Sequence, residues 1–154
     1  MRKGALIANL AIPLAVGGAA AWLTRGAMAH YGEIVRPAGS PPAAAFPIVW
    51  TGLYALMGIG AYRLWIREPS ETRRASLNFY AVSLALNFLW PVVFFCTQAY
   101  LPALLVLLAL LGMVIAWVVT LSRLDRTAAR LQLPYILWLA YAAYLNAGVW
   151  LLNR

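Results

Sequence analysis

The sequence contains charge-free stretches that are too long and too apolar for a protein that folds in water. Residues 75–122 contain no charged side chain, and residues 4–24 contain none either. A helix needs about 20 mostly apolar residues to cross a bilayer, so the longer stretch accommodates two such helices joined by a turn. In the whole chain 10% of residues are charged, against about 25% in a typical soluble domain. The chain is therefore predicted to be an all-α membrane protein.

The charged segments between these stretches divide the chain into a bundle of five transmembrane helices, forming one domain over residues 1–154. The expected spans are residues 4–24, 43–66, 75–97, 101–122 and 131–152. Residues 25–42 form the first loop, which contains prolines, glycines and charged side chains. Thr97, Gln98 and Pro102 mark the turn at which the long charge-free stretch folds back.

The N-terminal stretch also has some features of a cleaved signal peptide. Arg2 and Lys3 precede an apolar run, and the small residues Ala27 and Ala29 follow it. However, this apolar run reaches about 20 residues, whereas the apolar region of a signal peptide usually has about 7–15. We therefore expect the first span to remain in the mature protein.

The net charge of +8 raises the question of nucleic-acid binding. The basic residues lie at the ends of apolar stretches, however, and this placement is typical of membrane proteins. The side shared by the N-terminus and the second and fourth loops holds Arg2, Lys3, Arg67, Arg73, Arg74, Arg123, Arg126 and Arg130. The other side holds Arg25, Arg36 and Arg154. The positive-inside rule thus predicts a cytoplasmic N-terminus and an outside C-terminus, with the lipid bilayer as a partner and no nucleic acid.

The acidic residues exclude several kinds of chemistry. All of them lie in predicted loops: Glu33, Glu68, Glu71 and Asp125. Ion pumps and proton-coupled carriers usually need ionisable groups within the membrane, so these classes are disfavoured. There is no carboxylate pair, no nucleophile beside a base and no cluster of metal ligands, so we expect no catalytic acid–base residues, no metal and no cofactor. A lone loop histidine, His30, is a candidate haem ligand but is more typical of a solvated side chain.

Aromatic and amide side chains remain as candidates for function. On the second span, Trp50 and Tyr54 are four residues apart and share a face. Asn87 and Asn146 lie within the third and fifth spans, where an amide side chain needs a partner and should point into the bundle. One interpretation is that these groups hold helices together, at about 0.6–2 kcal/mol each. The other is an aromatic cavity for a large planar ligand, and the pattern alone leaves both open.

Several motifs in these spans resemble those of one known family. They are Arg36-Pro37 and Pro41-Pro42, Phe46-Pro47-x-x-Trp50-Thr51, Phe79-Tyr80, Asn87-x-x-Trp90, Phe94-Phe95, Pro134-Tyr135-x-x-Trp138 and Tyr144-Leu145-Asn146. In this order, over nearly the whole chain, they resemble the translocator protein family, whose members are also called tryptophan-rich sensory proteins or peripheral benzodiazepine receptors. The first loop departs from the family pattern, because His30 and Gly39 stand where the family usually has tryptophans and Arg36 replaces a lysine.

The resemblance implies a five-helix bundle with a pocket that opens toward the first loop and binds porphyrins, sterols and benzodiazepine-type ligands. Trp50, Asn87 and Trp138 match positions of the family's pocket. Further candidate lining residues are Tyr54, Trp90, Ala142 and Asn146. The family often forms homodimers, in bacterial members through small residues of the third helix, and Ala81 and Ala85 match that place.

The leading hypothesis is a membrane receptor or carrier for porphyrin-like tetrapyrroles, with sterol-like lipids as further ligands. Trp50 and Trp138 would stack on the ring, and Arg25 and Arg36 would pair with its propionates. One alternative is light-dependent porphyrin breakdown that uses the same two tryptophans. Another is a regulatory scaffold that binds no substrate. The expected location is a prokaryotic plasma membrane.

Overall fold

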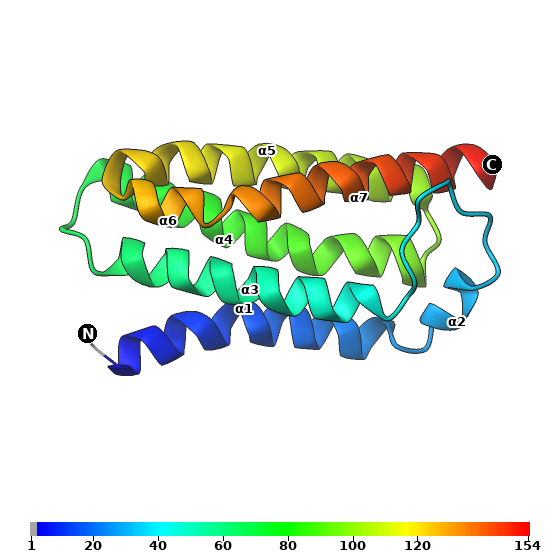
Figure 1. Cartoon of the computed structure of the whole chain (residues 1–154), viewed down its shortest axis with the longest axis horizontal. Coiled ribbons are helices and arrows are strands. Elements are labelled where there is room, and N and C mark those ends of the chain that lie inside the picture. Colours follow the sequence, from blue (N-terminus) through cyan, green and yellow to red (C-terminus); the bar gives the residue numbers. More distant parts are fainter. Residues whose placement is uncertain (1–2) are drawn as a thin grey trace.

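The chain forms a bundle of long helices that lie side by side (Figure 1), in a computed structural model that describes residues 3–154 except for the side chains of Met28 and Ala29. The long helices are α1 (Lys3–Thr24), α3 (Ala45–Trp65), α4 (Glu71–Pro91), α5 (Tyr100–Leu124) and α7 (Leu133–Leu152). A π-helical segment, η1 (Val92–Cys96), continues α4, and two short helices are α2 (Met28–Tyr31) and α6 (Arg126–Arg130). Five helical segments of the described chain are long and apolar enough to cross a membrane. The predicted all-α, five-helix fold class is thus confirmed.

Local capping explains where the helices depart from the expected spans. The third span begins at Glu71 rather than at residue 75, because the Ser70 hydroxyl accepts a hydrogen bond from the Arg73 amide at 3.1 Å and caps the helix. In the fourth loop, the Asp125 carboxylate accepts from the Ala128 amide at 2.9 Å and starts α6. Pro91 has no amide hydrogen to continue the α-helical ladder, and the chain widens into η1 directly after it.

Each helix packs mainly against one or two neighbours. Helix α1 contacts α3 and α4, α4 contacts α5, and α5 contacts α7. The backbones of α1 and α3 approach closely at Gly58, where an added Cβ would lie 2.8 Å from the Asn9 carbonyl oxygen and from the Leu10 Cα. In a bilayer, helix association depends on such close packing, because lipid tails are as apolar as the side chains.

Pairs of tryptophan and arginine mark both ends of the bundle. At the end that carries the first loop, the Arg25 guanidinium lies 4.7 Å from the Trp22 ring centre, and Arg154 lies 5.5 Å from that of Trp150. At the other end, Arg73 lies 5.3 Å from the Trp65 ring centre. Trp and Arg side chains favour the boundary between lipid tails and water, so these pairs indicate the two membrane interfaces.

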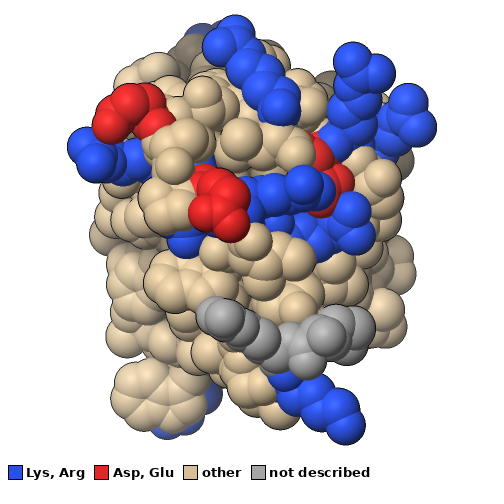
Figure 2. Space-filling view, turned by 90° about the vertical axis from the view of Figure 1, so that its left-hand side faces the viewer, with Lys and Arg blue, Asp and Glu red and all other residues tan. Residues whose placement is uncertain are grey.

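Most of the charged side chains among the described residues gather at one end of the bundle, which Figure 2 shows face on. We call this the arginine end; of the described residues it holds Lys3, Arg63, Arg67, Arg73, Arg74, Arg123, Arg126 and Arg130. Arg2, which the sequence assigns to the same end, lies outside the described residues. The C-terminus lies at the opposite end, together with the first loop (Figure 1).

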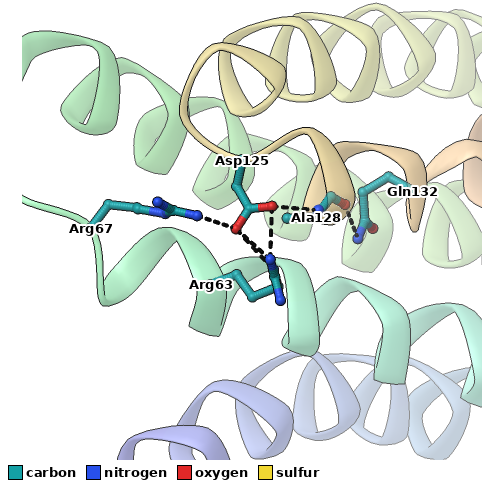
Figure 3. A network of polar contacts seen from close by, with 5 residues as sticks. All are labelled: Arg63, Arg67, Asp125, Ala128 and Gln132. Carbon is teal, nitrogen blue, oxygen red and sulfur yellow. Dashed lines mark hydrogen bonds and ion pairs between the residues drawn. The ribbon is translucent and has the colours of Figure 1, made fainter. Parts of the chain in front are cut away.

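A buried carboxylate ties three helices together at the arginine end (Figure 3). Both oxygens of Asp125 accept from Arg63, at 2.9 and 3.0 Å, and Arg67 donates to one of them at 2.5 Å. Burial alone would raise the pKa of Asp125, but hydrogen bonds from Arg63, the Ala128 amide and Arg67 outweigh it and hold the pKa well below its usual range. The cluster therefore joins the end of α3 to the junction of α5 and α6.

We predict that Asp125→Asn lowers the free energy of unfolding by about 1–3 kcal/mol, because two guanidinium groups lose their shared counter-charge. The matched control is Glu71→Gln, which breaks the exposed pair with Arg74 at 3.4 Å and should cost well under about 1 kcal/mol. Thermal unfolding in detergent at pH 7 measures both. Because the folded pKa is lowered, the Asp125 contribution is complete above about pH 4 and is lost as the pH falls further. Equal stability of the two variants would contradict this role.

Candidate ligand cavity

A cavity of about 450 Å³ lies between α1, α3 and α4, in the half of the bundle nearer the first loop. This volume falls within the range of small-molecule sites, about 300–1,000 Å³. The described residues that line it are Leu14, Gly17, Gly18, Ala20, Ala21, Thr24, Arg25, Phe46, Pro47, Trp50, Thr51, Tyr54, Asn87, Trp90, Pro91 and Phe95.

One wall of the cavity is aromatic. Trp50 and Tyr54, one helical turn apart on α3, have ring centres 5.5 Å apart and ring planes inclined by 31°. The Trp90 ring of α4 lies 6.3 Å from Trp50 at an inclination of 32°. Three rings from two helices thus form an extended surface on which a planar molecule can pack.

The Trp90 side chain is held in place by an amide. Its indole nitrogen donates to Asn146 Oδ1 at 3.0 Å, and Asn146 Nδ2 donates to the Tyr100 carbonyl at 2.8 Å. Asn146 is 1% exposed, which confirms the expectation that it points into the bundle. Its role in this structure is to fix Trp90, so the interpretation of a helix-joining amide applies here.

Asn87 differs from Asn146 because half of its amide has no partner. Its Nδ2 donates to the Tyr135 hydroxyl, while its buried Oδ1 has no hydrogen-bond partner among the described residues. The residue is 2% exposed and lines the cavity. A buried acceptor without a partner costs about 1–3 kcal/mol, so a ligand with a hydrogen-bond donor would gain by meeting it.

The wall formed by α1 was missed by the sequence analysis. It consists of small residues, and Gly17 is required because an added Cβ would lie 2.2 Å from the Tyr54 ring. The sequence signal was the run from Gly17 to Ala21, in which every side chain is absent or a methyl group. Such residues let another group approach the helix backbone closely.

The expected site residues fall into separate groups. Trp50, Tyr54, Asn87 and Trp90 come together in the large cavity, and Arg25 stands at its rim. Ala142 and Asn146 line a second cavity of about 20 Å³, and Phe46, Trp90 and Phe95 line both cavities and lie between them.

Trp138 lies behind the cavity wall, and Arg36 lies away from the cavity. The Trp138 ring packs edge-on against Phe46 at 6.1 Å, and its buried indole nitrogen has no partner among the described residues. Arg36 lies over the Tyr31 ring at 5.3 Å and borders a depression of the first loop.

The first loop is fastened to α7. The Asn153 side chain accepts from the Val35 amide at 3.0 Å and donates to the Val35 carbonyl at 2.8 Å. The Tyr141 and Tyr144 hydroxyls donate to the carbonyls of Gly39 and Ala38, at 2.6 and 3.0 Å. Gly39 has a φ of +81°, a conformation that favours glycine, so a glycine at this position suits the turn of the loop.

Tyr31 closes the end of the bundle beneath that loop. It is 6% exposed, and its ring packs edge-on against Phe46 at 5.7 Å and Phe95 at 5.8 Å. Burial raises the pKa of the Tyr31 phenol, and the neighbouring Arg36 partly opposes the shift. His30 is exposed and lies 3.3 Å from Glu33, and the described residues include no group of three metal-ligating side chains.

Comparison with known proteins assigns this bundle to a family. The TspO/MBR family profile matches residues 9–151. The chain belongs to the TspO/MBR family. Similar relatives include a protein named translocator protein from Sus scrofa, 37% identical over 80% of this chain and 75% of its own length. The tryptophan-rich protein TspO of Archaeoglobus fulgidus is 34% identical over 96% of both chains, and the protein CrtK of Rhodobacter capsulatus is 35% identical over 81% and 79%.

Proposed function

We propose that this TspO/MBR protein is a membrane receptor or carrier that binds a porphyrin-like tetrapyrrole in the large cavity. The observation that carries the proposal is the combination of three aromatic rings with one buried acceptor, Asn87 Oδ1, that has no partner among the described residues. A flat macrocycle would pack on the rings of Trp50 and Tyr54, and a hydrogen-bond donor at its edge would donate to Asn87 Oδ1. Transport is included because the Sus scrofa relative is named a translocator protein.

Sterols are the second ligand class in this proposal. The charge at the cavity rim distinguishes porphyrins from sterols. Arg25 is the one charged side chain among the described lining residues. A porphyrin with carboxylate side chains would form a charge-assisted hydrogen bond with it, whereas a sterol offers a single hydroxyl. The remaining lining is almost entirely apolar and suits either molecule.

We predict that Trp50→Ala weakens the binding of protoporphyrin IX by about tenfold or more, because a buried aromatic contact is lost. Trp138→Ala is the matched control and should stay within about twofold, since Trp138 lies behind Phe46. The shift of the porphyrin absorption band during titration measures both affinities in detergent. A loss at Trp138→Ala with none at Trp50→Ala would place the ligand elsewhere.

Light-dependent porphyrin breakdown is the second candidate function, and illumination of the same porphyrin complexes tests it. The observation that favours this function is the position of Trp50, which lines the cavity with its ring centre 6.3 Å from that of Trp90. Trp50 would supply an electron to the photoexcited porphyrin, and dioxygen would be the oxidant. Under illumination, the wild-type protein should convert bound porphyrin faster than the Trp50→Ala variant at equal occupancy. Bleaching at the rate of free porphyrin would leave binding as the function.

We propose that the arginine end faces the cytoplasm, because eight described basic residues gather there (Figure 2). In a Cys96→Ser background, an impermeant maleimide should label Arg154→Cys from outside intact cells. It should label Glu68→Cys only after the membrane is permeabilised. The reverse pattern would invert the proposed topology.

We also propose a homodimer through the outer face of α4. Ala81 and Ala85 are exposed in the single chain, beside the exposed apolar side chains of Val82, Phe88 and Leu89. Small residues four apart let two helices approach closely. Ala85→Trp should therefore shift the protein to monomers in single-molecule photobleaching, whereas Ala109→Trp, at an exposed alanine of α5, should not. An unchanged dimer with Ala85→Trp would exclude this face.

A further inference from the structure

The exposed part of the cavity lining lies on two helices only. It consists of Leu14, Gly18 and Ala21 on α1, of Arg25 directly after the end of α1, and of Pro47 and Thr51 on α3. The lining residues of α4 and η1 are buried or half-buried. The open side of the cavity therefore faces outward between α1 and α3, toward the surrounding lipid.

On the α1 side, the middle of this opening is lined by residues with little or no side chain, Gly18 and Ala21. The two helices are in close contact at Gly58 and again where Gly17 meets Tyr54. Nearer the first loop, a Cβ added at Gly18 would meet no atom within 4 Å. Leu14 lies ten residues inside Thr24, which corresponds to a depth of about 15 Å. The opening thus runs from the interface marked by Trp22 and Arg25 into the apolar region of the bundle.

The part of the first loop from residue 30 onward does not cover this cavity. None of residues 30–45, all of which the structure describes, belongs to the lining. The loop lies instead on α7, where Asn153, Tyr141 and Tyr144 hold it by four hydrogen bonds. Pro37 also packs against Gly148, where an added Cβ would lie 2.6 Å from the proline ring.

We infer that the ligand enters sideways from the bilayer, through the opening between α1 and α3, and that it is a membrane-dissolved amphiphile with an anionic group. The inference rests on the proposed function and adds the route and the charge of the ligand. Arg25 holds the anionic group at the interface, and the apolar body passes Gly18 and Ala21 to reach Trp50. The hydrogen-bond donor of the ligand then meets Asn87 at depth.

The chemistry of the opening selects this class of ligand. Its walls are apolar, and Arg25 is the single charged group among the described lining residues. The Arg25 guanidinium also lies over the ring of Trp22, which is 64% exposed, so the positive charge of Arg25 stays at the membrane interface. An acid that is dissolved in the lipid places its carboxylate at the same interface. A molecule that is charged at both ends would have to bring one charge into hydrocarbon.

The route is tested by the association rate of protoporphyrin IX that is preloaded into the lipid of nanodiscs holding the full chain. Gly18→Phe should slow association by about tenfold or more, since the ring narrows the opening. Gly112→Phe is the matched control, because Gly112 is exposed on α5 and its Cβ would also meet no atom. Asn153→Ala, which releases the loop from α7, should leave the rate unchanged.

The charge is tested by comparing protoporphyrin IX with its dimethyl ester. Arg25→Gln should weaken binding of the acid by about tenfold and leave the ester unchanged, because only the acid has a carboxylate to pair. Arg36→Gln, away from the cavity, should affect neither ligand. Equal losses for acid and ester would remove the anionic group from the inference.

The results of these experiments distinguish a failure of the lateral route from a failure of the proposed function. If wild-type protein fails to bind protoporphyrin IX, the proposed function fails. If it binds normally but Gly18→Phe associates as fast as Gly112→Phe, the lateral route is wrong and the function stands. Faster association of Asn153→Ala would identify the first loop as the door instead.

Discussion

The hydrocarbon core of a bilayer supplies no hydrogen-bond partners, and the arrangement of this protein follows from that constraint. A buried polar group without a hydrogen-bond partner in the bundle is therefore costly. Asn146 avoids this cost because its amide accepts a hydrogen bond from the Trp90 indole and donates one to the Tyr100 carbonyl. Asp125 avoids it at the arginine end, where its carboxylate accepts hydrogen bonds from two arginines and from a helix amide. By contrast, the Oδ1 of Asn87 has no partner among the described residues and lies at the wall of the cavity between α1, α3 and α4, where a ligand with a hydrogen-bond donor can satisfy it.

The same constraint divides the bundle into two functional halves. The half nearer the arginine end contains the charged cluster around Asp125 and the close backbone contact of α1 and α3 at Gly58. Toward the first loop, side chains on α1 become small and the cavity opens between α1 and α3. The charged cluster and the close helix contact therefore lie in one half of the bundle, and the space for a ligand lies in the other.

Much of this could be predicted from the sequence. Charge-free stretches predicted the five long helices, and the cost of burying an amide predicted that Asn87 and Asn146 point inward. The spacing of Trp50 and Tyr54 predicted a shared aromatic face, which the structure contains. These inferences succeed because each depends on local composition or on spacing along one helix.

The choice of helix neighbours could not be predicted in this way. A helix that is apolar all round shows no preferred face, so neither the α1 wall nor the position of Trp138 behind Phe46 followed from periodicity. The docking of the first loop on α7 depends on Asn153 and Tyr141, which lie more than 100 residues away along the chain. Such contacts are set by the folded arrangement rather than by any local pattern.

The most direct test of this account is an experimental structure of the protein in lipid with protoporphyrin IX bound. The macrocycle should lie between α1, α3 and α4, with one face on Trp50 and a hydrogen-bond donor at its edge within hydrogen-bond distance of Asn87 Oδ1. A macrocycle bound between α7 and the first loop against Trp138, or on the outer surface of the bundle, would contradict it.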